Sequence, residues 1–176
     1  MISEYARPGG RGAWTVGAAA AVAATAVAGA RAVDADSGWY RALDKPAWQP
    51  PSWAFGVVWT PLYATIAWSA GRALSRARGR ERTALAAGLA VNLGLNAVWN
   101  HLFFGRRSPR AGLLGTVALD LSNAQLMRQV ARTDRPAAAA LAPYTAWCLF
   151  ATALNGSLVR RNRGRRRGAV PLRGRP

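Results

Sequence analysis

The sequence predicts an all-α integral membrane protein, built as a bundle of five transmembrane helices with short loops. Charged residues are segregated along the chain. The chain has 24 Lys and Arg residues and 7 Asp and Glu residues, yet long stretches carry no charge. Charge-free stretches cover residues 14–30, 46–71, 83–105 and 136–159, the first being marginal in length. About 18 such residues suffice to cross a hydrocarbon core of roughly 30 Å. The pattern excludes a soluble globular domain, and it excludes nucleic-acid binding as the reason for the net charge of +17.

Three regions are expected along the chain. A polar lead-in at residues 1–12 precedes a transmembrane domain at 13–159, and an Arg-rich, disordered tail follows at 160–176. The five spans are expected at about 13–33, 53–72, 83–104, 111–130 and 137–159. These spans leave no room for a soluble domain, and their odd number places the two termini on opposite sides of the membrane.

The first two spans differ in character. The first is nearly all Ala, Val and Gly, which contribute little to insertion. A cleaved signal peptide is an alternative there, because Arg7 and Arg11 precede the apolar stretch. The second span contains Pro61 in its first turns, where a kink is expected. Between the two spans lie several prolines, which disfavour helix before themselves, so residues 34–52 are expected to form a stiff, non-helical loop.

Charge marks the limits of the later spans. Five Arg between residues 72 and 82 form a basic turn before the third span, and Arg106 and Arg107 follow its end. The fourth span has the weakest support, because Asp120 lies in its middle. An ionisable group within a membrane is a functional hypothesis unless it is paired or protonated. The alternative that we favour is structural, with hydrogen bonds to Ser122, Asn123 or a neighbouring helix.

The composition excludes most enzyme mechanisms. One cysteine, Cys148, allows neither an intramolecular disulfide nor a cysteine-rich metal site. One histidine, His101, and seven carboxylates leave no evident acid–base pair, and no nucleotide-binding, zinc-protease or serine-hydrolase motif occurs. We therefore expect no catalytic residues and no metal site, and breakdown of a bound ligand is the one enzymatic alternative.

Aromatic and amide side chains recur at helical spacing in three of the spans. Side chains three or four residues apart share one face of a helix. The second span carries Phe55, Trp59 and Tyr63, the third carries Asn92, Asn96 and Trp99, and the fifth carries Tyr144, Trp147 and Ala151. Because an amide in hydrocarbon needs a hydrogen-bond partner, these faces are expected to point into the bundle. They either join helix to helix or line a pocket for a flat ligand.

Three blocks of sequence carry a resemblance. The first runs from Trp39-Tyr40 through Lys45-Pro46-Ala47-Trp48-Gln49-Pro50-Pro51 to Val58-Trp59 and Leu62-Tyr63. The second is Asn96-Ala97-Val98-Trp99 with Phe103-Phe104-Gly105, and the third is Pro143-Tyr144 with Trp147, Ala151 and Leu154-Asn155. In order and spacing they resemble the TspO/MBR family, the tryptophan-rich sensory proteins of bacteria and the mitochondrial translocator proteins, over about residues 13–162.

The resemblance implies a five-helix bundle with a pocket beneath the first loop. It implies binding of a hydrophobic ligand such as protoporphyrin IX or a haem-like tetrapyrrole, with no cofactor required. Carried over to this chain, the pocket includes Trp59, Asn96, Trp99, Trp147 and Ala151, under a lid of Trp39, Pro46, Trp48, Pro50 and Pro51. We favour a membrane receptor or sensor with a regulatory or stress-related role. A porphyrin transporter and porphyrin degradation through pocket tryptophans are the alternatives.

The chain departs from the family in two places. Asn100 and His101 stand where many relatives have Ser-Pro, and the Tyr that the cholesterol motif of animal members needs is absent before Arg160. The expected partners are the lipid bilayer and a hydrophobic ligand, with no nucleic acid. Small residues at Ala90 and Gly94 leave a homodimer open.

Orientation in the cell membrane is the least determined property of this multi-pass protein. Positive charge in short loops favours the cytoplasmic side, which places the basic turn at residues 72–82 inside. The eight Arg of the tail at 160–176 favour the opposite orientation. We expect the tail to be cytoplasmic.

Overall fold

The computed structural model describes residues 9–163, and every regular element in this part of the chain is helical. The elements are α1 (Gly9–Ala32), α2 (Gly38–Arg41), α3 (Ser52–Arg76), α4 (Gly79–Asn100), a π-helical turn η1 (His101–Gly105), α5 (Pro109–Thr133), α6 (Arg135–Ala140) and α7 (Ala142–Arg161). The predicted lead-in and tail lie largely outside the described residues.

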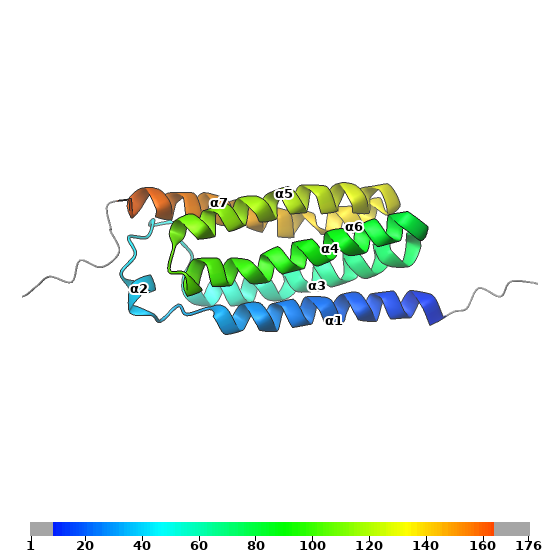
Figure 1. Cartoon of the computed structure of the whole chain (residues 1–176), viewed down its shortest axis with the longest axis horizontal. Helices are drawn as coiled ribbons and strands as arrows, with labels where there is room; N and C mark the ends of the chain where they lie inside the picture. Colours follow the sequence, from blue (N-terminus) through cyan, green and yellow to red (C-terminus); the bar gives the residue numbers. More distant parts are fainter. Residues whose placement is uncertain (1–8, 164–176) are drawn as a thin grey trace, which may run out of the picture.

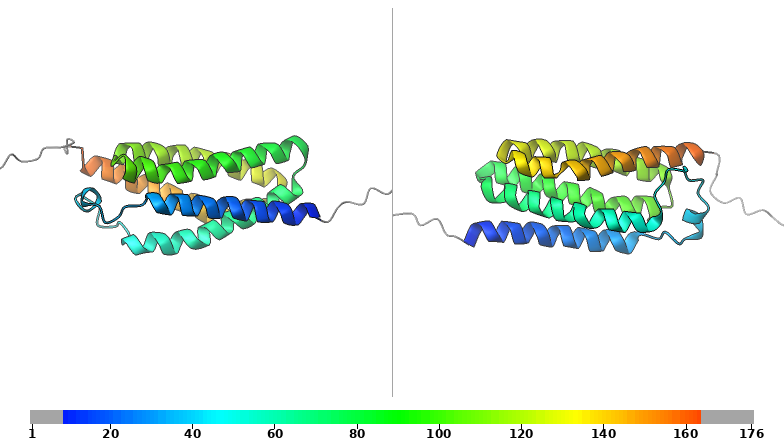
Figure 2. Two further views of the ribbon diagram at one scale, coloured as in Figure 1. Left: turned by 60° about the horizontal axis from the view of Figure 1, so that its bottom comes forward. Right: turned by 180° about the vertical axis from the view of Figure 1, so that it is seen from behind.

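The long helices run along one axis and pack around a common core (Figure 1). Helix α1 packs against α3 and α4, α5 packs against α4 and α7, and α6 packs against α3 and α5. The segment with α2 lies at one end of the bundle, together with η1 and the end of α7 (Figure 2). We name this the loop end, and we name the opposite end, with the tight connection between α3 and α4, the turn end.

Hydropathy alone supports fewer spans than the charge pattern predicts. Among the described residues, two stretches are long and apolar enough to cross a membrane, Gly12–Ala32 and Arg135–Arg161. The other long helices bury polar side chains, including Asn92 and Asn96 of α4 and Asn123 of α5. These amides lower the hydropathy of their helices even though they face inward.

The expectation that residues 34–52 form a non-helical loop is wrong for one helical turn within this segment. Gly38–Arg41 form α2, whose first turn is capped by Ser37, because the Ser37 hydroxyl accepts a hydrogen bond from the Tyr40 amide at 3.3 Å. A capping hydroxyl of this kind satisfies a backbone donor that a helix start leaves free. The prolines restrict the chain only from Pro46 onward, so they do not oppose this turn.

Two predicted spans are interrupted. The predicted 137–159 span is divided at Leu141 into α6 and α7, because Pro143 has no N–H to donate to the carbonyl four residues earlier. The predicted 83–104 span is α-helical to Asn100 and then widens into η1, where the Arg106 amide bonds the His101 carbonyl at 3.0 Å. By contrast, α3 continues through Pro61.

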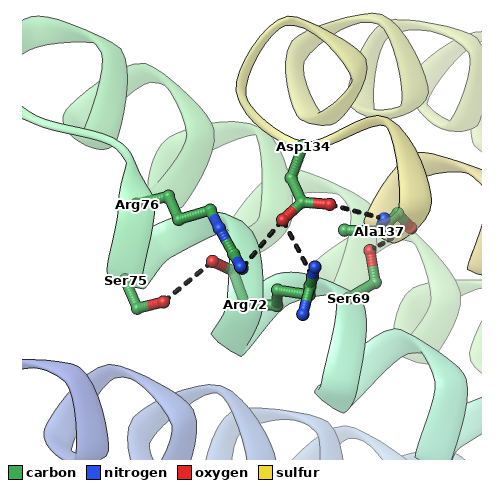
Figure 3. Close-up of polar contacts among 6 residues, drawn as sticks. All are labelled: Ser69, Arg72, Ser75, Arg76, Asp134 and Ala137. Atoms are coloured by element: carbon green, nitrogen blue, oxygen red, sulfur yellow. Dashed lines mark hydrogen bonds and ion pairs between the residues drawn. The ribbon is translucent and has the colours of Figure 1, made fainter.

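The turn end is closed by a backbone contact and a polar clamp. A Cβ on Gly71 of α3 would lie 2.8 Å from Thr15 Cα of α1, so a side chain there would force the two helices apart. In the clamp, Asp134 Oδ2 accepts from Arg72 Nε and Arg76 Nη1, both at 2.8 Å, while Asp134 Oδ1 accepts from the Ala137 amide at 2.9 Å (Figure 3). One carboxylate thus joins α3 to the start of α6.

The clamp changes the acidity of its carboxylate. Burial by itself raises the pKa of Asp134, whose side chain is 3% exposed. The hydrogen bond from the Ala137 amide and the charges of Arg72 and Arg76 outweigh burial, so the pKa lies below its ordinary value. A depressed folded-state pKa stabilises the fold above the unfolded pKa, and the stabilisation is lost as pH falls through the folded value.

We predict that Asp134→Ala destabilises the protein more than Asp134→Asn does, because Asn keeps an acceptor for the Ala137 amide and loss of a cap acceptor costs about 1 kcal/mol. Both changes remove the charge, so both should flatten the loss of stability on acidification. Thermal unfolding in detergent as a function of pH measures this, with Asp36→Asn as an exposed control. The prediction would be contradicted if the stability of the Asp134 variants fell as steeply with decreasing pH as that of the parent protein.

Candidate ligand-binding cavity

A cavity of about 420 Å³ lies inside the bundle at the loop end. Its wall comes from α1, α3, α4, η1, α5 and α7, and residues of the loop cover it. Pockets for drug-sized ligands measure about 300–1,000 Å³ and are mostly apolar, with a few placed polar groups. The described residues that line this cavity fit that pattern, since they are mainly aromatic or small and none of them carries a charge.

Three indoles from three different helices line the cavity: Trp59 of α3, Trp99 of α4 and Trp147 of α7. Each packs against a neighbouring ring of its own helix or of η1. The ring centroids are 5.1 Å apart for Trp59 and Tyr63, 5.5 Å for Trp99 and Phe103, and 5.1 Å for Trp147 and Phe150. These contacts fix the indole planes, so the wall presents flat surfaces in set positions.

A buried network of phenol and amide groups adjoins the cavity. The Tyr144 hydroxyl donates to Asn92 Oδ1 at 3.0 Å and accepts from Asn96 Nδ2 at 3.4 Å. Asn96 Oδ1 accepts from the Tyr63 hydroxyl at 3.2 Å, and Asn92 Nδ2 donates to Asn123 Oδ1 at 2.7 Å. The network therefore joins α3, α4, α5 and α7, and two of its members, Tyr63 and Asn96, also line the cavity.

Two loop residues, Tyr40 and Gln49, face the cavity. Gln49 Nε2 donates to the Tyr40 hydroxyl at 3.1 Å, and Lys45 Nζ lies 4.3 Å from the centroid of the Tyr40 ring. Burial raises the pKa of Tyr40 even though the Gln49 bond lowers it, and burial lowers the pKa of Lys45. Tyr40 is buried, at 8% exposed, so the underside of the loop is shielded from water at this residue.

The outer side of the loop is attached to η1 and to α7. The Trp39 ring meets Phe103 with centroids 5.4 Å apart, and the Trp48 ring meets Phe150 at 5.7 Å. The amide of Asn162 pairs with the backbone of Asp44 in both directions, each hydrogen bond measuring 3.0 Å. The loop is thus held as a cover over the cavity.

The predicted ligand-binding residues occupy three places in the structure. Seven line the cavity: Phe55, Trp59, Tyr63, Asn96, Trp99, Trp147 and Ala151. Asn92 and Tyr144 are buried behind the wall, in the polar network. The remaining five, Trp39, Pro46, Trp48, Pro50 and Pro51, belong to the loop and do not line the cavity. Ligand contact by any of them stays a prediction.

Several lining residues were not among the predicted set. Phe103 and Asn155 lie four residues beyond Trp99 and Ala151, on the same helix faces and within the second and third resemblance blocks, but they were not included in the predicted set. Tyr40 and Gln49 lie within the first resemblance block. The α1 wall, with residues such as Gly29, gives no signal, because the helix consists mostly of Ala, Val and Gly on all its faces.

The carboxyl group of Asp120 has a partner within the bundle. Thr152 Oγ1 of α7 donates to Asp120 Oδ2 at 2.6 Å, and among the described residues Asp120 forms no ion pair. Asp120 does not line the cavity. The bond joins α5 to α7, which supports the structural alternative for this residue.

Fold and site together define a helical bundle that holds an uncharged aromatic cavity beneath a covering loop. The chain belongs to the TspO/MBR family, whose profile matches residues 16–161. Proteins of this family are membrane proteins, and the names of its members include tryptophan-rich sensory protein and translocator protein.

The similarity extends over most of each relative. The chain is 37% identical over 135 residues to the translocator protein of Ovis aries, covering 74% of this chain and 78% of that protein. It is 35% identical over 127 residues to the tryptophan-rich protein TspO of Chlorobaculum tepidum, covering 72% and 80%. It is 36% identical over 143 residues to protein CrtK of Rhodobacter capsulatus, covering 80% and 89%.

We predict that Tyr144→Phe lowers the stability of the protein by about 1–3 kcal/mol, because Asn92 Oδ1 and Asn96 Nδ2 then stay buried without this partner. Tyr63→Phe should cost less, since Tyr63 lines the cavity, where water can replace the lost bond. Denaturation curves of the three proteins in one detergent provide the measurement. Equal stability of Tyr144→Phe and the parent protein would contradict the role given to the network.

Proposed function

We propose that the protein is a membrane receptor or sensor that binds a flat, hydrophobic ligand, such as protoporphyrin IX or another tetrapyrrole, in the cavity at the loop end. The observation that carries the proposal is that three indoles from three helices face one uncharged cavity. Stacking on an aromatic side chain contributes roughly 1–3 kcal/mol per ring, by analogy with nucleic-acid bases. The names of the relatives as sensory and translocator proteins support the same role.

The uncharged wall restricts how a tetrapyrrole can lie. An ionised carboxylate is costly to bury without a partner, so we expect the macrocycle between the indoles and its acidic groups at the mouth. The described residues of the wall include no acid–base pair, which favours binding over degradation of the ligand. The Thr152 partner of Asp120 gives no support to a proton-coupled carrier.

We further propose that α1, α3, α4, α5 and the α6–α7 pair each cross the membrane, with the tail on the cytoplasmic side. Large apolar side chains are exposed on the outer face of every one of these helices: Val16, Val57, Val91, Leu114, Leu121 and Leu149. A soluble bundle presents polar residues on that face. Leu114 is 72% exposed and Leu121 is 71% exposed, as expected of side chains that contact lipid.

We predict that Trp59→Ala and Trp147→Ala each weaken protoporphyrin IX binding by at least about 1 kcal/mol, because each removes a stacking surface. Spectral titration of the purified protein measures the affinity. Trp53→Ala is the matched control, since Trp53 lies on α3 with its ring 71% exposed, and Trp14→Ala is a second. Equal affinities in all variants would show that the cavity is not the binding site.

We predict that replacing residues 45–51 by a Gly/Ser stretch of equal length raises the rate of ligand dissociation. The replacement removes three prolines that keep the loop ordered, and it removes the contact of Trp48 with Phe150. Asn162→Ala removes the hydrogen bond to the Asp44 backbone, so it should also raise the dissociation rate, with a smaller effect. Dissociation of protoporphyrin IX, followed by tryptophan fluorescence, gives the rate. If helicity and insertion are intact and the rate is unchanged, the loop is a connector.

We predict alternating exposure of the connections to a membrane-impermeant maleimide. In a Cys148→Ala background, Asp36→Cys and Arg106→Cys lie at the loop end, whereas Arg80→Cys and Arg135→Cys lie at the turn end. With the tail cytoplasmic, intact cells should label only the turn-end pair, and permeabilised cells should label all four. Labelling of both pairs from one side would overturn the five-span topology, and the reverse pattern would overturn only its orientation.

A further inference from the structure

Two glycines of α5 lie behind one wall of the cavity. A Cβ on Gly112 would lie 2.5 Å from Phe103 Cδ2 and 2.7 Å from Asn155 Oδ1. A Cβ on Gly115 would lie 3.1 Å from Trp99 Cδ1. Both glycines are buried, and we name the pair the glycine shelf. Side chains of α4 and η1 therefore rest directly on the backbone of α5.

The two rings on the shelf stack on each other. Trp99 and Phe103 are stacked, with centroids 5.5 Å apart and an interplanar angle of 15°. Trp99 Nε1 donates to the Gly112 carbonyl at 3.1 Å, so the indole N–H is already used. Both rings line the cavity, and on this side the wall offers a ligand aromatic carbon surface without a free indole donor.

Other rings enclose Phe103 on the loop side. Its centroid lies 4.9 Å from that of Phe104, 5.4 Å from that of Trp39 and 6.2 Å from that of Tyr40. The π-helical turn holds its backbone, since the Ser108 amide bonds the Phe103 carbonyl at 3.2 Å. If a side chain on the shelf displaces the Phe103 ring, the cavity is therefore the open space into which the ring can move.

We infer that the glycine shelf determines ligand specificity: it sets the depth of the cavity and holds Trp99 and Phe103 as a preorganised stacking wall that favours extended planar ligands over smaller ones. The inference rests on the proposed function. A wall fixed before binding lowers the ordering cost that a ligand must overcome. A methyl group on the shelf would push a ring of this wall into the cavity, where a large ring system has less room to spare than a small one.

The experiment compares shelf glycines with glycines that touch nothing. Gly112→Ala and Gly115→Ala are the test variants, and Gly17→Ala and Gly156→Ala are the controls, because a Cβ at either control position would meet no atom of another element within 4 Å. The probes are protoporphyrin IX and 2-naphthol, titrated into the purified full-length protein. Gly115→Ala has the milder contacts, so it keeps the inference testable if Gly112→Ala does not fold.

We expect Gly112→Ala to bind protoporphyrin IX at least about tenfold more weakly, the scale of overpacking a well-packed site. Gly115→Ala should show a smaller loss, and 2-naphthol should lose less affinity than the porphyrin in both variants. The controls should bind both probes as the parent protein does. Equal losses for both probes in the shelf variants, or unchanged affinities in folded variants, would overturn the inference.

A second measurement is independent of any ligand. In protein labelled with 5-fluorotryptophan, the Trp99 resonance is assigned by its absence in Trp99→Phe. It should shift in both shelf variants and stay in place in the controls. An unshifted resonance in the shelf variants would overturn the role given to the glycine shelf. If the parent protein binds neither probe, the proposed function fails, while this resonance still decides whether the glycines position Trp99.

Discussion

Every polar side chain inside this apolar bundle needs a partner inside it, and that requirement fixes the rest of the structure. Tyr144, which is 1% exposed, is the hydrogen-bond partner of two amides, those of Asn92 and Asn96. Asn96 also bonds a side chain of α3, and Asn92 bonds a side chain of α5. Without water, an unpaired amide has no alternative acceptor or donor. Four helices therefore share the one mutual arrangement in which these hydrogen bonds all form. The same arrangement positions the wall of the cavity, because Asn96 belongs both to the network and to the wall.

The contrast between the two ends of the bundle follows from residue size. At the turn end, α1 and α3 approach to backbone contact at Gly71, and Asp134 and Ser69 tie α3 to α6. At the loop end, large rings project from several helices into the same space and keep the helices apart. These rings surround the space without filling it, and the remainder is the cavity.

The sequence predicted the helical class and the inward faces of α3, α4 and α7, because both follow from local patterns of charge and spacing. It could not separate the cavity wall from the layer behind it: Asn92 and Asn96 share a face, yet only Asn96 lines the cavity. Depth within a bundle depends on neighbouring helices. The clamp at Asp134 joins residues far apart in the chain, so it had no local signal.

The two ends also bear on the choice between sensing and transport. A carrier must open alternately to both sides, and in the described part of the chain the turn end is held together by a close contact at Gly71 and by the buried, ion-paired carboxylate of Asp134. The loop end joins the cavity to an exposed element, since the loop that covers it pairs with Asn162 at the end of α7. A ligand between Tyr40 and Trp147 would touch both the loop and α7. The proposed sensor role therefore has a physical route from the cavity to the end of α7.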